Sequence, residues 1–139
     1  MDNFLWRLPV YAAALWWGSL TTIGFLVVPL LFMHLPTPAL AGGMAAKLFT
    51  AQTWMSVACG GILLLTSTSK QASAPAQRAH DAIVFILLGM LLALLVEFAV
   101  APRIVTRTNL KLWHSVGSVM YLGQWLCAAI VFWRITPKH

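Results

Sequence analysis

The stretch AIVFILLGMLLALLVEFAVA, residues 82–101, decides the class of fold. Its one charged residue is Glu97, and about 20 mostly apolar residues are what a helix needs to cross the hydrocarbon core of a bilayer. Three further apolar blocks lie on either side of it, at residues 8–33, 48–66 and 112–133. We therefore expect an all-α protein, a four-helix transmembrane bundle that forms a single integral membrane domain over residues 1–139.

The composition excludes a water-soluble globule. Of the 139 residues 60% are hydrophobic and 9% are charged, whereas soluble domains have about 25% charged residues. Nine Lys and Arg residues against three acidic residues give a formal net charge of +6. These basic residues lie in short connections or at the edges of the apolar blocks, where they anchor helices and bind lipid headgroups. The expected partners are therefore membrane lipids, and we expect no nucleic acid.

The connections between the blocks differ in character. Residues 34–47, HLPTPALAGGMAAK, combine two prolines with small residues and predict a short interfacial helix between spans 1 and 2. Residues 67–81 resemble a flexible polar connector, with Asp81 as the N-cap of the third helix. Pro102 is expected to stop that helix. No internal repeat is evident.

The first block is too long for a signal peptide. About 26 apolar residues exceed the 7 to 15 of a signal-peptide core, so we interpret the block as a span that is tilted or bent near Pro29. Four spans place both termini on one side of the membrane. Five basic residues lie on that side and four on the other: Arg7, Lys70, Arg78, Arg134 and Lys138 against Lys47, Arg103, Arg107 and Lys111. We expect cytoplasmic termini in a bacterial inner membrane, with Lys47 and Arg103 discounted as residues that have partners within the protein.

Glu97 is the main candidate for a functional side chain, because ionisable groups inside a membrane are costly and usually have a role. The topology places it on the same side as two basic residues and two histidines. The predicted polar cluster consists of Lys47, Glu97, Arg103 and His114. Glu97 either forms an ion pair with Lys47 or Arg103, or binds a proton or cation, or extends to water.

Small and polar residues recur at helical spacing in every span, which is typical of packed helix faces. The stripes include Gly18, Thr22 and Phe25; Gln52 or Thr53, Ser56, Gly60 and Leu63; Gly89, Ala93 and Glu97; and His114, Ser118, Tyr121 and Gln124 or Trp125. We interpret them as interhelical contacts, with a polar cavity toward Glu97 as the alternative.

Cofactors and catalysis have little support in the sequence. Cys59 and Cys127 lie in mid-span as small apolar residues, and no CxxC, HxxxH or MxxM pattern suggests a metal site. A haem between His34 and His114 is the alternative to having no cofactor. No GxSxG, HExxH or P-loop motif occurs, so we do not expect an enzyme.

Several short stretches are similar to a known membrane family. They are Trp17-Gly18-Ser19, Val28-Pro29-Leu30-Leu31-Phe32, Leu35-Pro36, Ala41-Gly42, Lys47-Leu48-Phe49, Pro102-Arg103 and Trp113-His114 with Ser118. Together they resemble the transmembrane protein 205-like family, also called domain of unknown function 4149. The resemblance implies a four-helix integral membrane protein whose polar residues include Lys47, Arg103 and His114. It implies no reaction, and it suggests export or membrane organisation.

The chain departs from that family pattern at several positions. Thr50 stands where the family often has proline after Lys-Leu-Phe. Ser115, Val116 and Gly117 replace a common Gly-x-Ser after the histidine. Glu97 corresponds to no position of the pattern.

Three functions agree with these observations. The first is a non-enzymatic transport-associated or structural membrane protein. The second is a haem-binding or redox protein that uses His114 and His34. The third is a small proton-coupled exporter that uses Glu97 and forms a homo-oligomer, although small multidrug exporters carry their acid in the first helix, which has none here.

Overall fold

Four long helices dominate the structure. A computed structural model describes residues 2–68 and 73–136, with side chains from residue 4 onward. Its four helices long and apolar enough to cross a membrane are Phe4–His34, Pro38–Ser67, Ile83–Val105 and Leu110–Ile135. The predicted four-helix bundle is confirmed, and each span is longer than its apolar block because the helices extend into the polar flanks. Lys70 and Lys138 lie outside the described residues.

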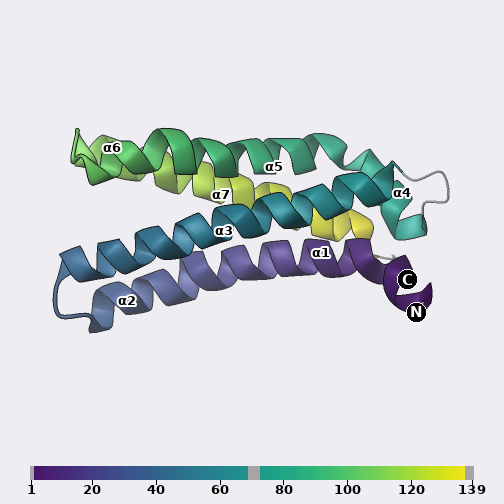
Figure 1. Ribbon diagram of the computed structural model, residues 1–139, viewed down its shortest axis with the longest axis horizontal. Helices are drawn as coiled ribbons and strands as arrows, with labels where there is room; N and C mark the ends of the chain where they lie inside the picture. Colours follow the sequence, from purple (N-terminus) through teal and green to yellow (C-terminus); the bar gives the residue numbers. More distant parts are fainter. Residues whose placement is uncertain (1, 69–72, 137–139) are drawn as a thin grey trace.

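Within residues 2–68 and 73–136, nine helical segments build this bundle, and Figure 1 shows their arrangement. The first span comprises α1 (Asp2–Thr22), the π-helical turn η1 (Ile23–Val27) and α2 (Val28–His34). The second is α3 (Pro38–Ser67), and a short helix α4 (Ala74–Asp81) follows it. The third comprises α5 (Ile83–Leu95), the π-helical turn η2 (Val96–Val100) and α6 (Ala101–Val105), and the fourth is α7 (Leu110–Ile135).

The spans form a ring, because α1 and α5 each pack against both α3 and α7. The start of α1 and the end of α7 lie together, as predicted, and we call this the terminal end of the bundle (Figure 1). The opposite end, where α2 turns into α3 and α6 turns into α7, is the loop end. We call α1 to α3 the first hairpin and α5 to α7 the second.

The predicted interfacial helix between spans 1 and 2 does not exist as a separate element. The helix α3 begins at Pro38, directly after Thr37, whose side chain accepts a hydrogen bond from the Leu40 amide at 3.3 Å. Proline is well suited to the first turn of a helix, and the small residues after it allow close packing against α2. Ala41 and Ala45 are buried as a result.

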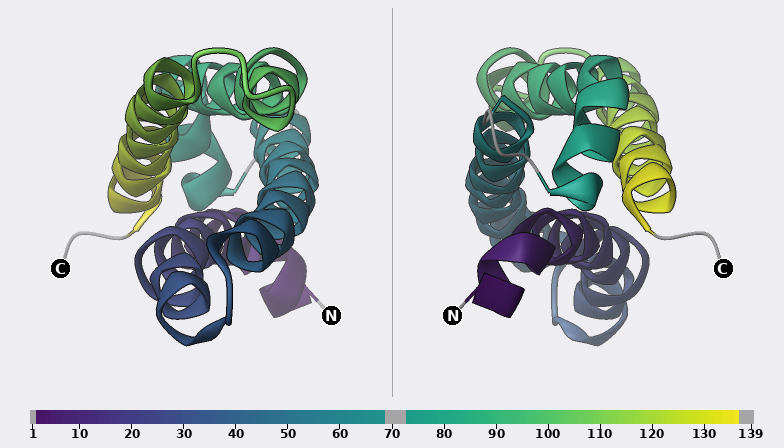
Figure 2. Two further views of the ribbon diagram at one scale, coloured as in Figure 1. Left: turned by 90° about the vertical axis from the view of Figure 1, so that its left-hand side faces the viewer. Right: turned by 90° about the vertical axis from the view of Figure 1, so that its right-hand side faces the viewer.

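The predicted connector at residues 67–81 contains the helix α4. Ser73 caps this helix by accepting a hydrogen bond from the Ala76 amide at 3.3 Å. Asp81 ends α4 instead of capping α5, so that prediction is wrong. The helix buries Pro75, Ala76 and Ala79 and contacts all four spans, and it lies across the space that the ring encloses (Figure 2). Its apolar face consists of small residues, so no hydrophobic pattern indicated it.

Two arginines hold α4 and α7 together at the terminal end. Arg78 donates to the Ile135 carbonyl at 3.2 Å, and Arg134 donates to the Asp81 carbonyl at 3.0 Å. Each guanidinium thus binds the last turn of the other helix, where carbonyl groups lack intrahelical partners and the helix dipole favours a cation. The terminal end is therefore closed by α4.

Each hairpin contains a π-helical turn followed by a proline. Pro29 lies in the first turn of α2, and Pro102 lies in the first turn of α6, so the expected stop at Pro102 is wrong. A proline ring inside a helix clashes with the carbonyl four residues earlier. The wider π-helical turn accommodates the ring, and the helix continues on the other side.

These turns are part of an internal repeat. Ile23–Val27 in η1 corresponds to Val96–Val100 in η2, each with one residue between the turn and its proline. Phe25 matches Phe98 and Val27 matches Val100. The buried positions of α1 and α5 also correspond: Ala13 with Ile86, Trp16 with Gly89, and Leu20 with Ala93. The sequence hid this relationship because few of these pairs are identical.

The second helices of the hairpins correspond in the same way. Matching positions of α3 and α7 are Phe49 with Tyr121, Gln52 with Gln124, Ser56 with Ala128, and Leu63 with Ile135. Since α1 and α5 run in one direction and lie on opposite sides of the ring, a pseudo-two-fold axis along the bundle relates the hairpins (Figures 1 and 2).

The core near this axis is asymmetric. Trp16 is fully buried against Gly89, where an added Cβ would lie 2.8 Å from the indole ring and 3.3 Å from the Cβ of Cys127. The predicted packing stripe of the third span is therefore confirmed at Gly89. The stripe predicted for the first span is confirmed only at Phe25, whose ring meets Trp125 of α7 edge-on at a centroid distance of 5.5 Å, because Thr22 is exposed and nothing lies within 4 Å of a Cβ added to Gly18.

Candidate functional site

Glu97 joins the two hairpins through a hydrogen bond. The hydroxyl of Thr50 on α3 lies 2.9 Å from Oε1 and 3.1 Å from Oε2 of Glu97 on η2, and it donates its proton to them. Both residues are half-buried. An ionised carboxylate can accept about four hydrogen bonds, so a single hydroxyl leaves most of its capacity free.

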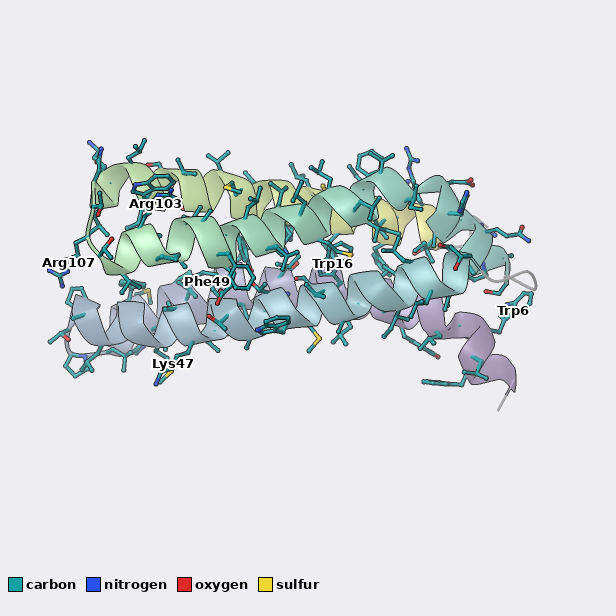
Figure 3. All side chains as sticks on the ribbon, turned by 45° about the horizontal axis from the view of Figure 1, so that its top comes forward. Trp6, Trp16, Lys47, Phe49, Arg103 and Arg107 are labelled. Atoms are coloured by element: carbon teal, nitrogen blue, oxygen red, sulfur yellow. The ribbon has the colours of Figure 1, made fainter. Side chains whose placement is uncertain are left out.

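The matching position in the first hairpin is Gly24, and its environment is closed. An added Cβ on Gly24 would lie 3.0 Å from the Tyr121 hydroxyl. That hydroxyl donates to the Leu20 carbonyl at 2.7 Å, and the Tyr121 ring meets Phe49 edge-on at a centroid distance of 5.3 Å. Figure 3 shows Phe49 between α3 and the second hairpin. The contact between the hairpins at Gly24 is therefore made by an aromatic ring, whereas the contact at Glu97 is a hydrogen bond to a carboxylate.

A polar network lies about one turn deeper, near the middle of the spans. We call Ser19, Gln52, Ser56 and Gln124 the amide cluster. The Gln124 amide nitrogen donates to Ser56 Oγ at 2.7 Å, and the Gln52 amide nitrogen donates to Ser56 Oγ at 3.3 Å and to Ser19 Oγ at 3.0 Å. The side chains of Gln52, Ser56 and Gln124 are buried. The cluster links α1, α3 and α7 across the pseudo-two-fold axis.

Some buried polar atoms in the described part of the chain have no hydrogen-bond partner. They are Gln52 Oε1 and the indole nitrogens of Trp16 and Trp17. In most proteins, buried polar atoms are hydrogen-bonded to protein or ordered water. The acceptor Gln52 Oε1 belongs to the amide cluster itself, so this cluster has an unused hydrogen-bonding position.

The structure does not bring the predicted polar cluster together. Glu97 bonds to Thr50, whereas the Arg103 guanidinium lies 4.6 Å from the centroid of the Trp113 ring and donates to the Ala99 carbonyl. Lys47 is exposed and points away from the bundle (Figure 3). His114 is exposed on α7. The ion pair expected between Glu97 and Lys47 or Arg103 is not formed.

The two histidines proposed as haem ligands lie on different hairpins. His34 ends α2, is exposed, and has Nδ1 3.0 Å from the Leu30 carbonyl oxygen. His114 lies in the second turn of α7. Within residues 2–68 and 73–136 no three His, Cys, Asp or Glu residues form a group that could hold a metal ion. Cys59 and Cys127 are buried and unbonded.

The helices pair within each hairpin at the loop end. There α2 packs on α3 and α6 packs on α7, and Figure 1 shows the two pairs separated. An apolar groove on α2 is lined by Val27, Leu30, Leu31, His34 and Leu35. The helix α4 thus lies across the bundle on one side of the amide cluster, and Glu97 lies on the other side.

Two functional features escaped the sequence analysis. Thr50 and Glu97 both depart from the family pattern. Nothing in the sequence indicates that their side chains form a hydrogen bond with each other. Gln52 and Gln124 were recognised as members of separate packing stripes. Their meeting at Ser56 depends on the register between α3 and α7, which periodicity within one helix does not determine.

The sequence of the chain matches one known protein family. The family described as Domain of unknown function (DUF4149) matches residues 11–111. The chain belongs to this family. The predicted resemblance is therefore confirmed. The matched part of this DUF4149 protein contains Lys47, Gln52, Glu97 and Arg103 and ends before His114. No curated protein and no solved structure is similar enough to count as a match.

Proposed function

We propose that this DUF4149 protein is a small, non-enzymatic, transport-associated membrane protein in which Glu97 binds and releases a proton. The observation that carries the proposal is the bond between Glu97 and Thr50. It places a carboxyl group between the hairpins inside the spans, held by a neutral hydroxyl and by no cation among the described residues. A carboxyl group inside a membrane that lacks a structural counter-ion is suited to proton exchange.

The surroundings of Glu97 support the same function. The helix α4 contacts all four spans at the terminal end, whereas Glu97 lies on η2, toward the loop end. Thr50 remains a hydrogen-bond partner for either form, because a hydroxyl donates to a carboxylate and accepts from a carboxylic acid. The pair therefore needs no rearrangement of the helices when the proton moves.

Infrared difference spectroscopy of the protein in lipid bilayers tests proton binding directly. A change in pH should give a carboxylic-acid carbonyl band that is absent from Glu97→Gln. The matched control is Asp81→Asn, which removes the exposed acid at the end of α4 and should leave that band in place. A band that survives in Glu97→Gln and disappears in Asp81→Asn would overturn the proposal.

Proton movement across the membrane is the second readout. Proteoliposomes with an entrapped pH dye and a clamped membrane potential should show proton uptake above protein-free vesicles. Glu97→Gln should abolish the uptake, and Asp81→Asn should retain it. Equal uptake by wild type and Glu97→Gln would contradict a role for this carboxyl group in transport.

We also propose that both termini face the cytoplasm of a bacterial cell. The support is the excess of basic residues on the terminal side, five against four. The Lys47 side chain is exposed, so Lys47 stays among the four basic residues counted on the other side. Fusing a reporter enzyme that is active only outside the cytoplasm to the C-terminus checks the orientation: an active fusion would reverse it.

A further inference from the structure

The amide cluster lies where the two repeats of the bundle meet. Gln52 and Gln124 occupy matching positions on α3 and α7, and both amide nitrogens donate to the one hydroxyl of Ser56. Gln52 and Gln124 are each 3% exposed, and Ser56 is fully buried. In secondary transporters built from internal repeats, substrate sites lie near the bilayer midplane at the interface between the repeats.

The hydrogen bonds of the cluster fix the orientation of the Gln52 amide. The Ser19 hydroxyl donates to the Trp16 carbonyl at 3.0 Å, and the Ser56 hydroxyl donates to the Gln52 carbonyl at 2.9 Å. Both serine oxygens are therefore left as acceptors for amide N–H groups. The Gln52 nitrogen must face the two serines, and Oε1 must face the other way, where no described group donates to it.

A structural contact alone does not explain this arrangement. Polar residues that only hold membrane helices together satisfy each other, whereas this cluster leaves a fully buried carbonyl oxygen unused. The side chain is held by two serines, so it cannot turn to another partner without losing those bonds. The unused acceptor points to a donor supplied from outside the protein.

We propose that Gln52, Ser56 and Gln124 form a binding site for a small uncharged solute that donates an N–H or O–H hydrogen bond to Gln52 Oε1. Amides and ureas belong to this chemical class, because they combine N–H donors with a carbonyl acceptor. Neither Glu97 nor Thr50 is part of the site, so the inference goes beyond the proposed proton exchange.

Thiol labelling of Ser56→Cys in proteoliposomes tests whether solutes reach the site. The native Cys59 is the internal control, since it lies three residues further along α3 and is buried. A small water-soluble methanethiosulfonate reagent should label position 56 and leave Cys59 unlabelled, as read by mass spectrometry of the peptides. Position 56 remaining as unreactive as Cys59 would overturn the proposal.

A second variant keeps the test independent of how well Ser56→Cys folds. Gln124→Cys lies three residues before the buried native Cys127 on α7, so it has the same internal control in the other repeat. We expect labelling at position 124 but not at Cys127. If both variants fold and neither is labelled, water-soluble molecules do not reach the amide cluster, and the proposal is overturned.

Competition by two matched solutes tests the hydrogen bond itself. Acetamide has N–H donors, and N,N-dimethylacetamide has none. Acetamide should slow the labelling of Ser56→Cys, and the dimethyl compound should not. Equal effects of the two solutes would overturn the requirement for a donor. The same labelling in a Glu97→Gln background should be unchanged, which separates the failure of this proposal from the failure of the proposed proton site.

Discussion

The two π-helical turns have the same shape and different chemistry. Both η1 and η2 are five residues long, and both are followed by a proline after one further residue. At matching positions η1 has Gly24, which leaves room for the Tyr121 ring, and η2 has Glu97, which binds Thr50. The two turns thus share their backbone shape and the proline that follows, while one side chain gives each copy its own contact.

The same contrast holds at the core. Trp16 in the first hairpin corresponds to Gly89 in the second, and these two residues pack against each other. Two tryptophans at matching positions would not fit beside the axis, and two glycines would leave a cavity. Asymmetry between the repeats is therefore a condition for dense packing beside the axis.

The largest expected effect follows from removing the fully buried Trp16. Trp16→Ala should lower the free energy of unfolding in detergent by about 3–5 kcal/mol, because the cavity beside Gly89 cannot collapse completely. Thermal or denaturant unfolding followed by circular dichroism measures it. Exchanging the pair as Trp16→Gly with Gly89→Trp should recover part of the loss if the repeats are equivalent. A double variant as unstable as the sum of both single variants would argue against that equivalence.

A smaller effect is expected at the glycine of η1. Gly24→Ala should lower the free energy of unfolding by about 1–3 kcal/mol, because its Cβ overlaps the Tyr121 ring. The matched control is Gly18→Ala on the same helix, where the added Cβ meets nothing within 4 Å. Equal thermal stability of the two variants would contradict the close contact at η1.

Loss of the hydroxyl that binds Glu97 should cost less. Thr50→Val should lower the free energy of unfolding by about 0.5–1.5 kcal/mol, the usual net contribution of one hydrogen bond. Thr66→Val is the control, since its hydroxyl bonds only to carbonyls of its own helix, at Ile62 and Leu63. If Thr66→Val is destabilised more in the same unfolding assay, the bond between the hairpins is not the stabilising one.

The smallest effect is expected at the loop end. Arg103 corresponds to Leu30 in the first hairpin, so Arg103→Leu makes the repeats more alike and removes the contact with Trp113. We expect a loss of about 0.5–1 kcal/mol, as for an exposed cation–π pair. Arg107→Leu is the control in the adjoining turn. A larger loss in the control would show that the aromatic contact has no stabilising effect.

The candidate site was only partly predictable. The sequence alone predicts Glu97 as a candidate, because it is the one charged residue in the apolar stretch 82–101 and ionisable groups inside a membrane are costly. The ion pair with Lys47 or Arg103, one of three alternatives for Glu97, rested on topology alone and does not form, since Glu97 binds Thr50. Topology gives the side of the membrane on which a residue lies, but the rotation of each helix decides which side chains face one another. Lys47 and Thr50 are less than one turn apart on α3, and Lys47 is exposed while Thr50 reaches Glu97.

The sequence by itself determined the membrane class, the number of spans and most of their boundaries to within four residues, although the second span begins at Pro38 and not at residue 48. Hydrocarbon thickness imposes a minimum length of apolar helix, and that constraint is local to each segment. Tertiary structure alone decided the inward position of α4, the passage of the helix through Pro102, the repeat and the meeting of Gln52 with Gln124. These features depend on the register and rotation of helices that are distant in sequence, which are determined by close packing between side chains of different spans.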